Sequence, residues 1–179
     1  MVNLVVGMAT WAGILSAMMI GARNEEGLDK TIHTSAALGV IVGIIIGAFG
    51  YIFSPTFLRW MDSPEEVIGK ATIYIRTCFL GVPGSLTFNF LAAIVRSAGD
   101  TKHPLKILSF TGILNVVLNL ILVIVFKLDV VGVAVATITS QYVSALLIIK
   151  RMISSKGNCR LVLKKVRIWK EQAIRIFQI

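Results

Sequence analysis

The sequence is poor in charge, cysteine and histidine. Charged residues make up only 15% of its 179 positions, and there are two cysteines and two histidines. Cys78 falls in an apolar run and Cys159 in a basic tail, so we expect neither a disulfide framework nor a zinc site. No acidic residue or histidine lies deep in an apolar run, although proton relays inside membranes usually need one. Short signatures of hydrolases, metalloproteases and nucleotide-binding proteins are also missing, which predicts a protein that is not an enzyme and needs no cofactor.

Long apolar runs dominate the chain instead. Hydrophobic residues account for 56% of it, and the mean hydropathy is +0.83. Runs close to the ~20 residues that cross a hydrocarbon core recur along the sequence. We therefore predict an all-α, polytopic helical membrane protein, with transmembrane helices at about 2–21, 34–56, 71–95, 104–126 and 130–149. A transmembrane β-barrel does not fit, because the runs are continuous and do not alternate.

Basic residues are distributed unevenly over the predicted loops. The formal net charge is +9. Five spans place 14 of the 18 lysines and arginines on one side and 4 on the other. The positive-inside rule then predicts a plasma-membrane protein with its amino terminus outside and its carboxy-terminal tail in the cytoplasm. This distribution accounts for the basic charge without nucleic acid, for which the chain has no binding motif.

The tail, residues 151–179, is the second region of the predicted domain organisation. Val162, Val166, Trp169, Ala173 and Phe177 recur at helical spacing, and most of the tail's cations lie away from them. This pattern predicts a basic amphipathic helix on the cytoplasmic membrane surface, with the lipid bilayer as its partner.

Glycine and proline mark two of the predicted spans. Gly39, Gly43 and Gly47 follow one another at a spacing of four, which predicts a face for close helix packing. Pro83, flanked by Gly81 and Gly84, removes one hydrogen bond from the third span and is expected to bend it. Such a bend either borders a cavity or serves packing alone, and the sequence leaves both readings open.

A short polar connection, residues 96–104, joins the third and fourth spans. Gly99 can adopt the left-handed conformation that closes a helix. Pro104 suits the first turn of the helix that follows.

Two groups of polar residues lie inside the last two spans. Asn115 and Asn119 share a face of the fourth span by their spacing of four. In the fifth span, Thr137, Ser140 and Ser144 share a face, with Gln141 beside them. Such amides and hydroxyls either line a path for a solute or cation, or hold neighbouring helices together by hydrogen bonds.

Four stretches of the sequence resemble the amino-terminal half of a multidrug and toxic compound extrusion (MATE) transporter. They are 21–26 (GARNEE), 96–104 (RSAGDTKHP), 115–119 (NVVLN) and 132–141 (GVAVATITSQ), in the order in which that family has them. The resemblance implies that the five spans correspond to helices 2–6 of a twelve-helix transporter built from two six-helix lobes. It further implies that residues 151–179 link the first lobe to a carboxy-terminal lobe that this sequence does not contain.

A function follows from the resemblance. It implies part of a secondary-active exporter that exchanges small cationic or amphipathic compounds for protons or sodium ions. Asn115, Asn119, Thr137 and Gln141 would line the substrate or ion pathway. Four other residues would have structural or hinge roles, namely Pro83, Gly99, Asp100 and Pro104.

The chain departs from the family at important points. The family's first helix and second lobe are missing, and Asn119 stands where the family often has an acid that can carry a proton. We therefore expect a fragment that is inactive alone. Two alternatives remain. One is a lipid-linked oligosaccharide flippase of related architecture, which would be favoured by cationic residues within the spans, where the chain has only Arg76, near a span end. The other is a membrane remnant that does not transport.

Overall fold

Five long α-helices dominate the computed structural model, which describes residues 2–60, 65–155, 159–162, 166, 169, 172–174 and 176. In chain order they are α1 (Val2–Gly21), α2 (Glu25–Trp60), α3 (Glu65–Ser97), α4 (Lys102–Leu120), which continues as the π-helical segment η1 (Ile121–Val125), and α5 (Asp129–Ile153). Each predicted transmembrane run has its own helix, which confirms the all-α fold.

Four helices of the described chain are long and apolar enough to cross a membrane. They cover Glu25–Leu58, Ile68–Ser97, Lys102–Val125 and Asp129–Ile153, and α1 adds the shorter apolar helix Ala9–Gly21. The molecule is therefore a multi-span membrane protein.

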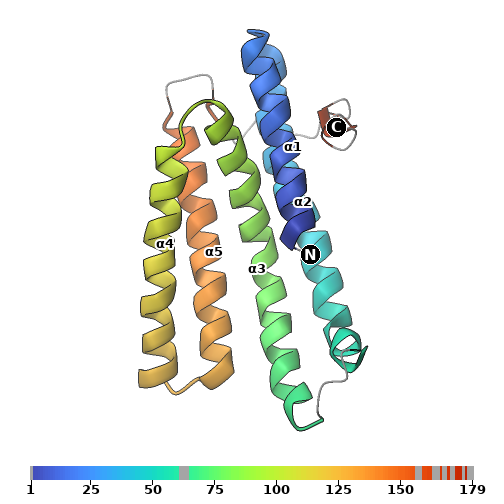
Figure 1. Ribbon diagram of the computed structural model, residues 1–179, viewed down its shortest axis with the longest axis vertical. Coiled ribbons are helices and arrows are strands. Elements are labelled where there is room, and N and C mark those ends of the chain that lie inside the picture. Colours follow the sequence, from blue (N-terminus) through green and yellow to red (C-terminus); the bar gives the residue numbers. More distant parts are fainter. Residues whose placement is uncertain are drawn as a thin grey trace.

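Helix α3 lies at the centre of the bundle (Figure 1). It packs against α1 and α2 on one side and against α5 on the other. Helix α4 packs chiefly against α5 and hardly touches α3. As a result, Pro104 and Thr111 are the buried residues of α4, while large apolar side chains such as Leu105 and Ile113 face outward. Such an apolar surface is suited to contact with lipid or with further helices.

Helix α2 begins nine residues before the predicted span, so the charged loop expected at 22–33 is mostly helical. Asn24 caps the helix, because its Oδ1 accepts a hydrogen bond of 2.8 Å from the backbone N–H of Gly27. Arg23 has the positive φ of 52° that turns the chain away from α1. The first turns of α2 are charged on one face only, and their other face carries Leu28 and Ile32 into the core.

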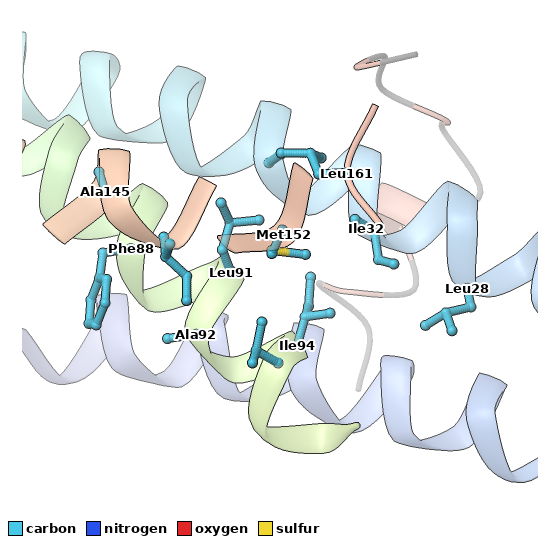
Figure 2. Packing of buried hydrophobic residues seen from close by; sticks show 12 residues of the cluster. Leu28, Ile32, Phe88, Leu91, Ala92, Ile94, Ala145, Met152 and Leu161 are labelled. Atoms are coloured by element: carbon cyan, nitrogen blue, oxygen red, sulfur yellow. The ribbon is translucent and has the colours of Figure 1, made fainter. Parts of the chain in front are cut away.

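The larger of the two hydrophobic clusters joins α2, α3, α5 and the tail near one end of the bundle (Figure 2). Leu91 and Ile94 of α3 are fully buried there, together with Ile148 of α5. Leu161 of the tail lies in the same cluster and is 2% exposed. The described part of the tail around Leu161 is therefore packed into the core.

The described part of the tail differs from the amphipathic helix predicted for it. Val162, Val166 and Trp169 are not helical, whereas Ala173 lies in a short helical stretch and Phe177 is outside the described residues. The backbone N–H of Val162 donates to His33 Nε2 at 3.1 Å, and that of Trp169 donates to Thr34 Oγ1 at 3.3 Å. Because buried side chains of α2 accept these hydrogen bonds, this part of the tail has no need of helical ones.

The fourth span ends within one residue of the prediction, but its last turn has a helix type that was not predicted. The α-helix ends at Leu120, and five residues of π-helix carry the chain to Val125. The backbone N–H of Phe126 accordingly donates to the carbonyl of Ile121, five residues earlier, at 3.1 Å. Lys127 and Asp129 both have positive φ, at 52° and 49°, and reverse the chain into α5.

Candidate functional site

The glycine stripe of α2 packs directly on α3, as predicted. A Cβ at Gly43 would lie 2.5 Å from the Cα of Pro83, and one at Gly39 would lie 3.0 Å from the Cα of Thr87. At Gly47 a Cβ would lie 2.8 Å from the carbonyl oxygen of Phe79, which is the acceptor that Pro83 leaves without its helical donor. A glycine hydrogen facing that oxygen offsets part of the lost hydrogen bond.

Pro83 both packs against another helix and borders a groove, the two roles that the sequence left open. Its Cα packs against Gly43, and it also borders an apolar groove of about 380 Å³ between α2, α3 and α5. Helix α3 continues through Pro83 without a break. Its role as a hinge stays a prediction.

The connection between α3 and α4 contains the expected glycine. Gly99 has a φ of +88°, and the two hydrogen bonds of a Schellman motif are present, from Gly99 N–H to Arg96 O and from Asp100 N–H to Val95 O. Pro104 is buried in the first turn of α4. The conformation predicted for this connection is therefore confirmed.

Asp100 links this connection to the end of α5. Its carboxylate accepts hydrogen bonds from the backbone N–H and Nδ1 of His103, and lies 3.3 Å from Arg151 Nη2. Burial acts to raise the pKa of Asp100, but the hydrogen bonds from His103 and the positive charge of Arg151 outweigh it and hold the pKa below its ordinary value. Asp100 is thus ionised at neutral pH and joins α3, α4 and α5 at one end of the bundle.

Asn115 and Asn119 face each other along α4. The Nδ2 of Asn119 donates to Asn115 Oδ1 at 3.1 Å. The Oδ1 of Asn119 is buried and accepts no hydrogen bond from the described protein. The pair therefore presents an open amide acceptor inside an apolar segment, directly before the π-helical turn of η1.

The hydroxyl residues of α5 differ in whether they contact a neighbouring helix. Ser144 Oγ lies 2.8 Å from Thr111 Oγ1 of α4 and 2.9 Å from the carbonyl of Ser140. Thr137 donates to the carbonyl of Val133 within its own helix. Ser140 and Ser144 are buried, so this face holds α4 and α5 together, as the packing interpretation expects.

Gln141 points to a different neighbour. Its Oε1 lies against Gly81 of α3, where an added Cβ would force the Gln141 side chain to move. This oxygen is buried and has no donor among the described residues. Among the described residues no hydrogen bond connects the Asn115–Asn119 pair to Thr137 or Gln141, and a shared pathway of the four residues stays a prediction.

Three residues at these contacts were not singled out from the sequence. Thr111 is the partner of Ser144, Arg151 is the partner of Asp100, and His33 is the acceptor for the tail. The apolar spacing of Leu28 and Ile32 was the available signal that His33 belongs to a helix. Arg151 carried no signal beyond its charge, because its partner lies 51 residues away.

Comparison with known proteins identifies the family. A family model described as MatE matches residues 1–121, which is more than half of the chain. The chain belongs to the MatE family. The resemblance found in the sequence is thereby confirmed.

Named relatives of this MatE chain include bacterial proteins of multidrug resistance. It is 32% identical over 126 residues to "Probable multidrug resistance protein YpnP" of Bacillus subtilis, a match that covers 70% of this chain and 28% of that protein. It is 28% identical over 167 residues to "Multidrug export protein MepA" of Staphylococcus saprophyticus, with 93% and 37% covered. The chain therefore spans about a third of the length of these relatives.

Solved MATE structures share the fold of this MatE chain. The inward-facing conformation of a multidrug resistance MATE family transporter of the MOP superfamily matches with a TM-score of 0.89 and 26% identity, covering 98% of this chain and 40% of that one. The outward-facing conformation matches with a TM-score of 0.89 and 25% identity, covering 98% and 39%. The five helices therefore form part of a membrane transporter fold.

Proposed function

We propose that this chain forms part of a secondary-active multidrug exporter, which exchanges small cationic or amphipathic compounds for protons or sodium ions. Membership of the MatE family and the match to multidrug transporters support this function. Because the chain spans about 40% of the solved transporters, the proposed pathway includes helices supplied by the rest of the exporter, among them the carboxy-terminal lobe.

The observation that carries the proposal at the site is the open acceptor at Asn119. A buried amide oxygen without a donor is unusual in a folded protein and suits a ligand that brings a donor or a positive charge. Asn115 fixes the orientation of this amide through the 3.1 Å hydrogen bond. An amide oxygen can coordinate a sodium ion or accept from an ammonium group, but it cannot carry a proton.

The proposed orientation places the amino terminus outside the cell and the tail in the cytoplasm. Two ion pairs mark the opposite ends of the bundle: Asp100 with Arg151, and Lys70 with Asp129 at 2.9 Å. The Asp100 end carries most of the basic residues, which supports its assignment to the cytoplasm.

The test is dye export from efflux-deficient cells that express this chain alone or together with a matching carboxy-terminal portion of a MATE transporter. We expect accumulation of a fluorescent cationic dye to fall only when both parts are present. Asn119→Leu should then reduce export about tenfold, because the buried acceptor is lost.

Asn89→Leu provides the matched control. Asn89 is also an amide within a span, but its Nδ2 donates to the carbonyl of Ser85 in its own helix. Equal losses of export in both variants at equal membrane abundance would contradict a special role for Asn119. Dye accumulation that never falls, despite good abundance of both parts, would favour a remnant that does not transport.

A further inference from the structure

An apolar groove opens on the outside of the bundle between α2, α3 and α5. Its volume is about 380 Å³, and its walls include Ile44, Tyr51, Phe79, Leu80 and Tyr142. Gly47 and Ala48 leave its floor low because they lack large side chains. The exposed fractions of Ile44 and Leu80 are 54% and 53%, so the groove is open on the surface of this chain.

Arg76 lies at one end of this groove through its contact with Tyr51. Its Nε donates to the carbonyl oxygen of Tyr51 at 3.3 Å, and its guanidinium carbon lies 5.2 Å from the centre of the Tyr51 ring. No carboxylate of the described side chains pairs with Arg76. Its terminal Nη donors are therefore available to a ligand, and a charge within a span calls for a counter-charge.

Arg76 lies between the aqueous end of α3 and the far end of the groove at Pro83. Lys70 and Asp129 form an exposed ion pair that marks the aqueous end of α3. Arg76 comes six residues later, which is about 9 Å deeper along the helix at 1.5 Å per residue. Pro83, at the far end of the groove, lies about 11 Å beyond Arg76 by the same rise.

Tyr142 closes the groove on the side of α5. Its hydroxyl donates to the carbonyl of Leu80 at 2.8 Å, so the polar end of this side chain is satisfied and its ring forms an apolar wall. The groove thus runs from a cationic end, the nearer one to the exposed Lys70–Asp129 pair, to an apolar end at Pro83.

We propose that this groove binds an anionic glycerophospholipid, with its phosphate on Arg76 and one acyl chain along Tyr51, Leu80 and Pro83. A guanidinium can hold two phosphate oxygens at once. The phosphate of a zwitterionic lipid is already partly neutralised by the lipid's own ammonium group, so it attracts the guanidinium less strongly. The apolar walls of the groove favour a ligand with an acyl chain, and therefore a lipid over a free phosphate. The site depends on insertion into a membrane and not on the proposed export activity.

The test is lipid retention by the full chain, measured by native mass spectrometry after purification with phosphatidylglycerol or phosphatidylcholine of identical acyl chains. We expect the chain to retain phosphatidylglycerol in preference. Arg76→Gln should lower that retention about fivefold. Arg76→Lys should lower it less, because lysine keeps the positive charge but cannot hold two phosphate oxygens at once. Ala48→Leu should lower retention by filling the groove, and as an exposed side chain it leaves the core unchanged.

Lys70→Gln is the control for general attraction of anionic lipid, because Lys70 is an exposed cation of the same helix outside the groove. Equal retention by Arg76→Gln and the unchanged chain, or equal losses in Arg76→Gln and Lys70→Gln, would overturn the proposal. So would a dimer that disappears in Ala48→Leu, since it would assign the groove to a second copy. Retention of glycerol phosphate as strong as that of the lipid would also overturn it.

Discussion

Gly43 determines how closely α2 approaches α3. The neighbour that a Cβ would meet is the backbone of Pro83, which cannot rotate away as the end of a flexible side chain could. The contact therefore depends on the absence of a single carbon atom.

We expect Gly43→Ala to destabilise the bundle by about 1–3 kcal/mol, the usual cost of adding a methyl group to a tightly packed contact. The measurement is thermal unfolding of the purified chain in detergent. Gly112→Ala is the matched control, because a Cβ at Gly112 would meet nothing within 4 Å. Equal unfolding temperatures for the two variants would show that α2 and α3 can separate at little cost.

At the scale of single residues, spacing within one helix was predictable and neighbours across helices were not. Asn115 and Asn119 face each other because residues four apart share a helix face. The contact of Gln141 with Gly81 depends on the register of α5 against α3, which arises from packing along the whole length of both helices. No local pattern in the sequence encodes that register.

At the scale of elements, apolar runs predicted which segments are helical but not where each helix begins and ends. The first turns of α2 are amphipathic, so their charged face suggested a loop although Leu28 and Ile32 are buried. The π-helical turn of η1 concerns the backbone hydrogen-bond register, which leaves no trace in side-chain composition. The tail was misjudged because its backbone finds hydrogen-bond partners on α2, far away in the sequence.

His33 is the main polar contact of the tail and yields a test at this scale. Its Nδ1 lies 2.7 Å from the carbonyl of Asp29, so Nδ1 carries the proton and Nε2 accepts from Val162 N–H. The ring is fully buried, and it also meets Trp169 edge to face with centroids 6.4 Å apart. Loss of this acceptor leaves the partly buried N–H of Val162 without this hydrogen bond, at a cost of about 1 kcal/mol.

We expect His33→Leu to release the tail and to speed tryptic cleavage after Arg160 by roughly tenfold, because protease attack follows the population of the open form. The measurement is limited proteolysis of the intact chain in detergent, followed by mass spectrometry. His103→Leu, which removes the exposed histidine of the α3–α4 connection, should leave the rate unchanged. Identical rates in all three proteins would mean that apolar contacts such as Leu161 hold the tail without His33.

At the scale of the whole molecule, the helix arrangement of this chain can be compared with two transporter conformations. The same arrangement of helices matches the inward-facing and the outward-facing transporter with equal TM-scores of 0.89. The arrangement of these five helices therefore differs little between the two conformations.

Orientation in the membrane is the remaining property of the whole molecule, and two turns of the structure allow it to be measured. Leu128 lies in the turn between α4 and α5, and Lys102 lies at the start of α4. The 24 residues of Lys102–Val125 separate these turns. At 1.5 Å per residue this is about 36 Å, more than the ~30 Å of a hydrocarbon core.

With Cys78 and Cys159 replaced by serine, we expect Leu128→Cys to react with an impermeant maleimide in intact cells and Lys102→Cys to react only after permeabilisation. The reason is the excess of basic residues at the Lys102 end, since such residues are retained in the cytoplasm. Both positions are exposed, so a difference in labelling reports the side of the membrane and not burial. The opposite labelling pattern would invert the proposed orientation and place the tail outside the cell.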